Sequence, residues 1–141
     1  MKAQDIMTPH PVCVTPETRI QEAAQMMRDQ DIGMLPVIEN DGSKHLVGVV
    51  TDRDIAIRHV AEGHGSSDCP VKEAMSEKVT TASPGADVNE VLKLMSREQV
   101  RRIPIVDERG DLVGVVAQAD LVLHAEDDRK VERTIEEISK P

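Results

Sequence analysis

An internal repeat constrains this chain more than any other feature. Residues 7–36 match residues 75–104, with a Met-Thr or Met-Ser pair and two prolines at the same spacing, at an offset of 68 residues (75 − 7). After Gly42 the first copy carries two extra residues, so that Gly48 aligns with Gly114 at an offset of 66 (114 − 48). A domain of about sixty residues buries too little surface to be comfortably stable alone. We therefore expect the two copies to share one core.

The first helix of each copy is predicted from capping residues and helical spacing. Thr18 and Gln21 form a capping box in front of apolar residues at i, i+3, i+4 and i+7, which predicts a helix of about twelve residues beginning at Thr18. In the second copy, Asp87 and Glu90 supply the cap before the same apolar pattern. We expect both apolar stripes to pack in the core.

Each first helix is followed by the pattern of a β-hairpin and then by a second helix. The predicted hairpin strands are Leu35–Ile38 with Leu46–Thr51, and Ile103–Val106 with Leu112–Ala117. The predicted second helices are Asp52–Glu62 and Gln118–Glu126, and short opening strands are predicted at Val12–Val14 and Val79–Thr81. Each copy therefore has the predicted order β-α-β-β-α.

The predicted boundaries follow from this order. Residues 1–62 form the first repeat, residues 63–70 a Gly- and Ser-rich linker, and residues 71–126 the second repeat. Residues 127–141 form a tail that places Val131, Ile135 and Ile138 on one helical face. We expect this helical tail to dock on the body of the chain or on a partner chain.

Composition excludes several partners. The chain has 17 basic and 26 acidic residues, a net charge of −9, and no Phe, Tyr or Trp. Acidic charge repels phosphate backbones, and aromatic platforms for base stacking are absent, so we expect no nucleic-acid partner. The longest apolar run, Leu46 to Val50, is too short to cross a bilayer, and the N-terminus lacks a signal-peptide core. We expect a cytoplasmic protein without a membrane partner.

The sequence contains no recognisable catalytic arrangement. The five histidines are scattered, and no nucleophile elbow, metalloprotease or P-loop motif is present, so we expect no enzyme. Cys13 lies between two valines and is predicted as a buried strand thiol, whereas Cys69 precedes a proline in a loop. Packing is the favoured role of both thiols over a disulfide or a metal, because no CxxC pair exists. No metal site is therefore predicted.

The segment Gly48–Asp54 carries the strongest candidate chemistry. A glycine within a strand lets a ligand approach the backbone, and the N–H groups at a helix start favour phosphate. The carboxylate of Asp54 could accept the hydroxyls of a ribose. Alternatively, Thr51 only caps the helix and Asp54 only complements its dipole. The residues alone favour this second interpretation.

The second copy is not equivalent at this segment. It keeps Gly114 and Asp120 but has Ala117 in place of the hydroxyl. Arg101 and Arg102 stand immediately before its first hairpin strand, where the first copy has Gly33-Met34. Paired arginines suit a phosphate, although solvated surface arginines are the simpler alternative. The asymmetry predicts two unequal sites.

The duplicated pattern resembles a tandem pair of CBS domains, named after cystathionine β-synthase. The likeness rests on the registered copies and on the signature G-h-x-[ST]-x-x-[DN], which falls on residues 48–54, and it covers residues 5–125. It is closest to small stand-alone bacterial CBS-pair proteins. The resemblance implies an α+β fold (an α/β sandwich) of two β-α-β-β-α repeats packed sheet to sheet with pseudo-two-fold symmetry, plus a C-terminal helix. It also implies a homodimer.

The resemblance implies two clefts for adenosine-containing ligands. The residues it assigns to the main cleft are Thr51, Arg53, Asp54, Val79, Thr80, Thr81, Ala82, Arg101, Arg102, Ile103 and Pro104. In that cleft Thr51 would contact phosphate or ribose, Asp54 the ribose hydroxyls, and an arginine the phosphates. The residues it assigns to the second cleft are Val12, Cys13, Val14, Met34, Leu35, Pro36 and Asp120. We expect this second cleft to be weak or empty, because it lacks the hydroxyl and the arginines.

The resemblance implies a regulatory function in which the chain binds an adenine nucleotide. AMP, ADP and ATP are the favoured ligands, and NAD and S-adenosylmethionine are less favoured. The bound ligand would not be a catalytic cofactor but would shift the pairing of repeats or protomers, and an unidentified regulated protein would read the change. The alternative is a ligand-independent dimeric structural module with vestigial clefts. A third class, an enzyme acting on ATP, is disfavoured by the missing catalytic residues.

Overall fold

The structure, a computed structural model, describes residues 1–63, 68–124 and 136–138. The chain divides into two compact units. The middle unit is Val12–Val79, and the terminal unit combines Met1–Pro11 with Thr80–Pro141. These units do not coincide with the repeats of the sequence, because the first eleven residues pack with the second repeat. None of the helices in the described ranges is long and apolar enough to span a membrane.

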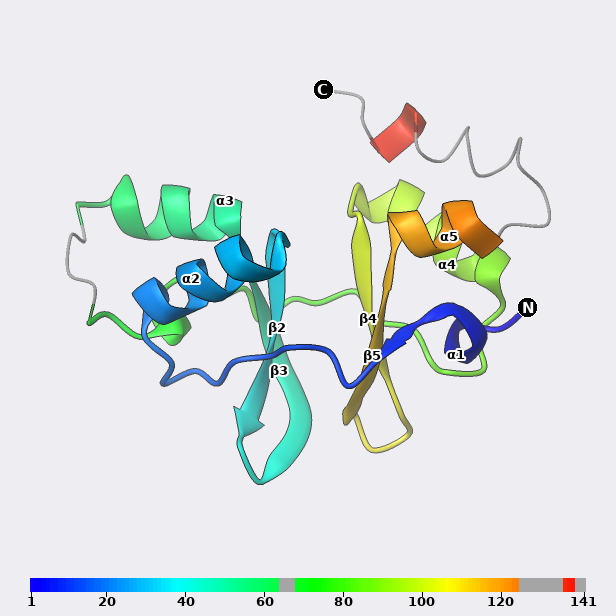
Figure 1. Ribbon diagram of the computed structural model, residues 1–141, viewed down its shortest axis with the longest axis horizontal. Helices are drawn as coiled ribbons and strands as arrows, with labels where there is room; N and C mark the ends of the chain where they lie inside the picture. The colour runs from blue at the N-terminus through cyan, green and yellow to red at the C-terminus, as the bar shows by residue number, and fades with distance from the viewer. Residues whose placement is uncertain (64–67, 125–135, 139–141) are drawn as a thin grey trace. The chain divides into compact units, whose positions relative to one another are not determined.

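The middle unit is built on one antiparallel hairpin, β2 (Met34–Asn40) with β3 (Ser43–Thr51), as the sequence predicts. Helix α2 (Ile20–Gln30) lies beside the hairpin (Figure 1). Its remaining elements are α3 (Asp52–Asp54), η1 (Ile55–Val60) and η2 (Val71–Glu73). Its core consists of small and branched aliphatic residues and one methionine: Val14, Ile20, Ala23, Met27, Leu35, Val37, Val50, Val71 and Ala74.

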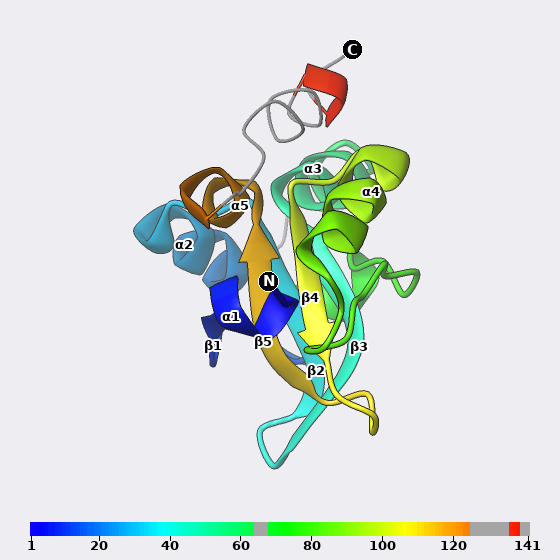
Figure 2. The same ribbon diagram turned by 90° about the vertical axis from the view of Figure 1, so that its right-hand side faces the viewer.

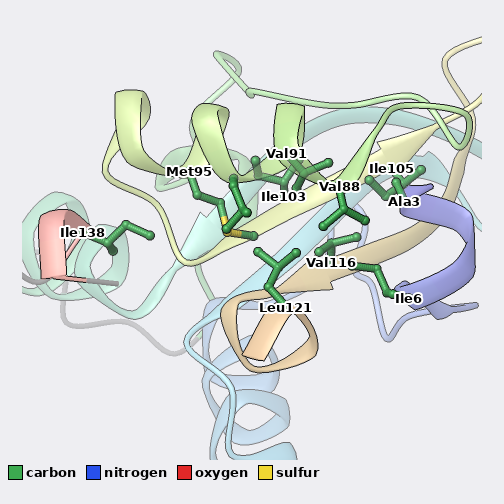
Figure 3. Packing of buried hydrophobic residues seen from close by; sticks show 11 residues of the cluster. Ala3, Ile6, Val88, Val91, Met95, Ile103, Ile105, Val116, Leu121 and Ile138 are labelled. Atoms are coloured by element: carbon green, nitrogen blue, oxygen red, sulfur yellow. The ribbon is translucent and has the colours of Figure 1, made fainter. Parts of the chain in front are cut away.

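The terminal unit contains a three-stranded antiparallel sheet in the order β1-β5-β4 (Figure 2). The strands are β1 (Thr8–Pro9), β4 (Arg102–Val106) and β5 (Leu112–Ala117). The helices are α1 (Ala3–Ile6), α4 (Val88–Glu98) and α5 (Gln118–His124). In the core, Val91 and Met95 of α4 point toward Leu121 of α5 (Figure 3).

The first helices confirm the predicted pattern but correct one cap. Asp87 caps α4, because its side chain accepts a hydrogen bond from the Asn89 N–H at 2.8 Å. The predicted capping box at Thr18 is wrong: Arg19 is the N-cap of α2, and the Thr18 hydroxyl accepts from the Thr15 N–H instead. Thr18 therefore stabilises the turn before the helix, a common competing use of such a side chain.

The predicted opening strands are also wrong. Val14 makes only an isolated parallel bridge with Val37, and the second copy makes its bridge at Ala82 with Ile105. In each case a single residue supplies both ladder hydrogen bonds: Val14 bonds to the carbonyl of Pro36 and to the N–H of Ile38. No longer strand forms here, and Cys13 is a half-buried residue outside any strand.

The short segments that open each repeat pair instead with the second hairpin strand of the other repeat. β1 pairs with β5, with Thr8 opposite Val115. Ser76, which aligns with Thr8 in the sequence, exchanges two backbone hydrogen bonds with Val49 of β3, at 3.0 and 2.8 Å. Each compact unit therefore takes its opening segment from the other repeat.

The helix predicted over Asp52–Glu62 is not a regular α-helix. A three-residue α-helical turn, α3, passes into the π-helical η1, where the Ala61 N–H donates to the Ala56 carbonyl five residues before it. Its counterpart α5 is α-helical from Gln118 to His124, and the last two residues predicted for it lie outside the described residues. Among the described residues, the π-helix at this position therefore occurs in the first copy alone.

The predicted tail is described only at residues 136–138, which are helical. Ile138 is buried in the core of the terminal unit, and the Ser96 hydroxyl donates to the Glu137 carboxylate. Val131 and Ile135, as well as linker residues 64–67, lie outside the described residues. Ile138 thus docks on the body of the chain.

Candidate functional site

The predicted Thr51–Asp54 turn forms a reciprocal cap at the end of β3. The Thr51 hydroxyl accepts from the Asp54 N–H at 3.0 Å, and the Asp54 carboxylate accepts from the Thr51 N–H at 3.0 Å. The capping role of both side chains is therefore confirmed, since each satisfies a backbone donor at the helix start. The cap also holds the carboxylate rigidly at the strand end.

One oxygen of this carboxylate takes no part in the cap. Asp54 Oδ2 is used by the cap, whereas Oδ1 lies 3.9 Å from Arg58 Nε, and the side chain is 17% exposed. The Arg58 guanidinium in turn donates to the Met75 carbonyl at 3.2 Å. Arg53 is exposed beside them. A fixed, partly exposed carboxylate of this kind can accept hydroxyl hydrogen bonds.

The second copy holds its carboxylate in the same way but less completely. Asp120 accepts from the Ala117 N–H at 2.8 Å, which reproduces one half of the reciprocal cap. Ala117 has no hydroxyl, so the other half is missing. The predicted inequality of the two copies is therefore visible in the local geometry.

The remaining residues predicted for the main cleft fall into both units. Val79 ends the middle unit, whereas Thr80, Thr81, Ala82, Arg101, Arg102, Ile103 and Pro104 belong to the terminal unit. Arg101 is exposed and Arg102 half-buried, so both can reach an anion. The side chains of Ile103 and Pro104 are buried in the core. That these residues complete a site with Thr51 stays a prediction.

Of the residues predicted for the second cleft, Met34, Leu35 and Pro36 lie on β2, and Val12, Cys13 and Val14 belong to the segment that bridges to it. Leu35 and Pro36 are buried, so only their backbone can meet a ligand. Burial raises the pKa of the Cys13 thiol, nearby Lys44 lowers it and Asp41 raises it further. Val12, Val14 and Met34 belong to the same unit and Asp120 to the other. This cleft also stays a prediction.

The ligand-facing role suggested for Gly48 is corrected. A Cβ at this position would lie 2.6 Å from the Ser76 carbonyl oxygen, and one at Gly114 would lie 2.4 Å from Met7 Sδ. The opening segments of the repeats therefore occupy the space beside both glycines. Gly48 permits the close approach of protein backbone, and Gly114 mainly that of the Met7 side chain, rather than the approach of a ligand.

Sequence reasoning missed one cluster of polar side chains. His59, Cys69 and Glu73 bring one imidazole nitrogen, one sulfur and one carboxylate oxygen within 4.8 Å of one another. No familiar spacing motif connects these residues, because ten positions separate His59 from Cys69 (69 − 59). Comparison of aligned positions is the signal that could have found them, since Ala125, Met1 and Asp5, which align with the three residues, supply neither an imidazole nor a thiol.

Comparisons with known proteins agree with the repeat. The family model of the CBS domain matches twice, at residues 3–59 and 71–127. CBS domain-containing protein YhcV of Bacillus subtilis (strain 168) is 40% identical over 121 residues, which cover 86% of this chain and 83% of that protein.

Solved structures share the fold. The crystal structure of Hypoxic Response Protein I with two coordinated zinc ions has a TM-score of 0.79 and 36% identity, and the match covers 88% of this chain and 98% of that one. The CBS domain pair of protein MJ0100 with 5-methylthioadenosine and S-adenosyl-L-methionine has a TM-score of 0.74 and 28% identity, covering 87% and 98%. CBSX2 in complex with AMP has a TM-score of 0.76 and 25% identity, covering 86% and 93%.

The two family matches together span most of the chain, and they coincide with the two copies of the repeat. The described elements give the α+β fold expected of such a pair. The chain therefore belongs to the CBS-domain family, as a tandem pair of CBS domains.

Proposed function

We propose that this chain is a non-catalytic regulatory module that binds an adenine nucleotide through the Thr51–Asp54 turn. The observation that carries the proposal is the Asp54 carboxylate, which the cap holds through one oxygen, while the other oxygen lies 3.9 Å from Arg58 Nε and the side chain is 17% exposed. Ribose offers two neighbouring hydroxyl donors to such an oxygen. The AMP and S-adenosyl-L-methionine complexes of CBS pairs similar to this chain support an adenosine-containing ligand.

The preferred ligands are AMP, ADP and ATP, ahead of NAD and S-adenosylmethionine. Arg101 and Arg102 are available for phosphates in the terminal unit, and Arg53 is exposed beside Asp54. Arginine binds phosphate through paired N–H donors.

Binding would shift the population of two arrangements of the pair, which a regulated protein would detect. The alternative remains a ligand-independent dimeric module whose Thr51–Asp54 turn serves only as a cap.

Calorimetric titration of AMP, ATP, NAD and S-adenosylmethionine into the wild type and Asp54→Asn tests the proposal. We expect saturable binding to the wild type and at least about a tenfold loss of affinity in the variant, because a hydrogen bond to a charged group contributes about 1.5–3 kcal/mol. Asp54→Asn retains an oxygen that can accept from the Thr51 N–H, so it perturbs the fold less than alanine would.

Asp120→Asn is the matched control, because Asp120 forms the equivalent backbone hydrogen bond in the second copy. It should leave the affinity of the main site unchanged. An equal loss in both variants would contradict a ligand contact by Asp54. No heat with any ligand on folded protein would favour the ligand-independent module.

We also propose that the chain forms a homodimer through its second helices. Ile57 and Val60 are exposed on η1, and Val122 and Leu123 are exposed on α5, Leu123 by 79%. Ile57 and Leu123 occupy aligned positions of the two copies (123 − 57 = 66). Apolar side chains exposed at equivalent positions are typical of an interface that uses both repeats.

Leu123→Glu should convert this dimer to a monomer, because a charge would be buried at the apolar contact. Sedimentation velocity over a range of concentrations measures the change. Gln25→Glu, an exposed polar substitution on α2, serves as the control and should remain dimeric. A wild type that sediments as a monomer at all concentrations would contradict the dimer.

A transition-metal ion is a second candidate ligand class. The specific observation that favours it is the convergence of His59, Cys69 and Glu73 in the middle unit. The two zinc ions coordinated in Hypoxic Response Protein I, which is 36% identical to this chain, support this class.

A further inference from the structure

Three side chains of the middle unit converge although they come from different elements. His59 belongs to η1, Cys69 precedes η2, and Glu73 is the last residue of η2. Their donor atoms lie within 4.8 Å of one another. Zinc binds nitrogen at about 2.0–2.1 Å and sulfur at about 2.3 Å. Adjustment of side-chain torsions, above all of the exposed Glu73, would bring the three donors onto one ion.

The backbone around these donors is held in place by hydrogen bonds to other parts of the unit. The Cys69 carbonyl accepts from the Ile20 N–H at 2.8 Å, and the Val71 N–H donates to the Thr18 carbonyl at 2.7 Å. On the other side, Arg58 beside His59 donates to the Met75 carbonyl at 3.2 Å. The backbone on the Cys69 side of the cluster is therefore anchored, which lowers the cost of reorganisation on metal binding.

The burial of His59 is unusual in this chain. Among the residues that the structure describes, His59 is the one buried polar side chain, with 6% exposure. It lies on the π-helical η1, and π-helical turns occur often at functional sites. The imidazole is the buried member of the cluster, Cys69 is half-buried and Glu73 is exposed. A neutral imidazole in such a cluster is a common metal ligand.

Comparison of aligned positions in the repeat tests independently whether the packing of the fold requires these three residues. The aligned positions are Ala125 for His59, at an offset of 66, and Met1 and Asp5 for Cys69 and Glu73, at an offset of 68. These positions hold neither an imidazole nor a thiol. Asp5 serves there as a cap, accepting from the Lys2 N–H at 2.9 Å. The donor set therefore occurs in the middle unit alone at these aligned positions and is not a requirement of the repeated fold.

We propose that His59, Cys69 and Glu73 bind one transition-metal ion of the zinc class, an inference that rests on the second candidate function above. The thiolate excludes magnesium and calcium as preferred ions, and a mixed nitrogen, sulfur and oxygen set suits zinc. Cys69 loses its thiol proton to solvent on binding. Three protein ligands leave a fourth position for water, so the ion is exchangeable. It joins η1 to η2 across the segment between the two helices.

Cobalt titration of the reduced, chelator-treated full chain tests the proposal. Cobalt reports thiolate ligation through a charge-transfer absorption and four-coordination through intense visible bands. We expect saturation at about one ion per chain in the wild type. Cys69→Ser should abolish the charge-transfer absorption, whereas Cys13→Ser, the matched control in the same unit, should retain it.

Zinc competition with a chromophoric chelator then measures affinity. Glu73→Gln and His59→Asn should weaken zinc binding by at least about tenfold, because even the loss of a partner behind a ligand has effects of this size. Glu62→Gln and His45→Asn are exposed controls and should bind as the wild type does. Since Glu73 is exposed, Glu73→Gln remains informative if the buried His59 variant fails to fold.

The outcomes separate the metal class from its proposed ligands. A wild type that binds neither cobalt nor zinc would overturn both the metal class and the three proposed ligands. Metal binding that persists unchanged in Cys69→Ser and Glu73→Gln would overturn these ligands while retaining the metal class. Titration of metal-free Cys69→Ser with AMP tests the nucleotide proposal independently of the metal proposal. Asp54 is not among the metal donors, so the affinity of this variant for AMP should equal that of the wild type.

Discussion

Gly48→Ala is expected to lower the free energy of unfolding by about 1–3 kcal/mol, the range for overpacked sites. The new Cβ would lie 2.6 Å from the Ser76 carbonyl oxygen. This oxygen accepts the Val49 N–H in the bridge between β3 and the segment from the other repeat. Relief of the clash therefore requires backbone movement and loss of that pairing. Urea denaturation followed by circular dichroism measures the change.

Alanine substitutions of two other glycines serve as comparisons for this result. Gly85→Ala introduces a Cβ with no atom within 4 Å and should change stability little. Gly114→Ala should have an intermediate effect, because its nearest obstacle is the flexible Met7 side chain, although the Thr8 carbonyl lies 3.0 Å away. Equal stability of the Gly48 and Gly85 variants would contradict the close packing of the opening segment.

Ile105→Ala is expected to lower the free energy of unfolding by about 2–5 kcal/mol. Ile105 is fully buried in β4 of the terminal unit, and it forms the bridge with Ala82. The surrounding core has no aromatic side chain that could move into the space, and branched aliphatic residues collapse incompletely around a cavity. Chemical denaturation and the thermal midpoint should both report the loss.

Ile57→Ala is the matched control because Ile57 is 47% exposed on η1. Its effect on the free energy of unfolding of the monomeric unit should be small. If Ile57→Ala and Ile105→Ala destabilise the chain equally, the assignment of Ile105 to the core would be contradicted. Dimer dissociation is monitored separately by sedimentation, since Ile57 belongs to the proposed dimer surface.

The sequence predicted those parts of the fold that depend on local periodicity. The hairpins, the first helices and the Asp87 cap follow from neighbouring residues, and the repeat supplied each pattern twice. The exchange of opening segments was not predictable, because Ser76 and Val49 are brought together by long-range packing. For the same reason, the spacing alone could not assign Gly48 to a backbone contact.

The nucleotide and metal candidate sites also differ in whether local sequence rules could predict them. Thr51 and Asp54 are three positions apart, so the rules for helix caps predicted their contact. His59 and Cys69 are ten positions apart and share no local motif, so no local rule predicts that their donor atoms converge. Metal-ligating side chains supplied by separate elements are therefore the hardest sites to find in a single sequence.

The exchanged opening segments also bear on the origin of the chain. A single repeat, residues 1–62, contains the Met7-Thr8 segment but lacks the Ser76 that completes its hairpin sheet. Two separate copies could supply each other's missing strand, as in a domain-swapped dimer of an ancestral half-length protein. Gene duplication and fusion would replace that concentration-dependent association with an intramolecular one of much higher effective concentration. Each unit could then diverge, and the middle unit is the one that brings an imidazole and a thiol together.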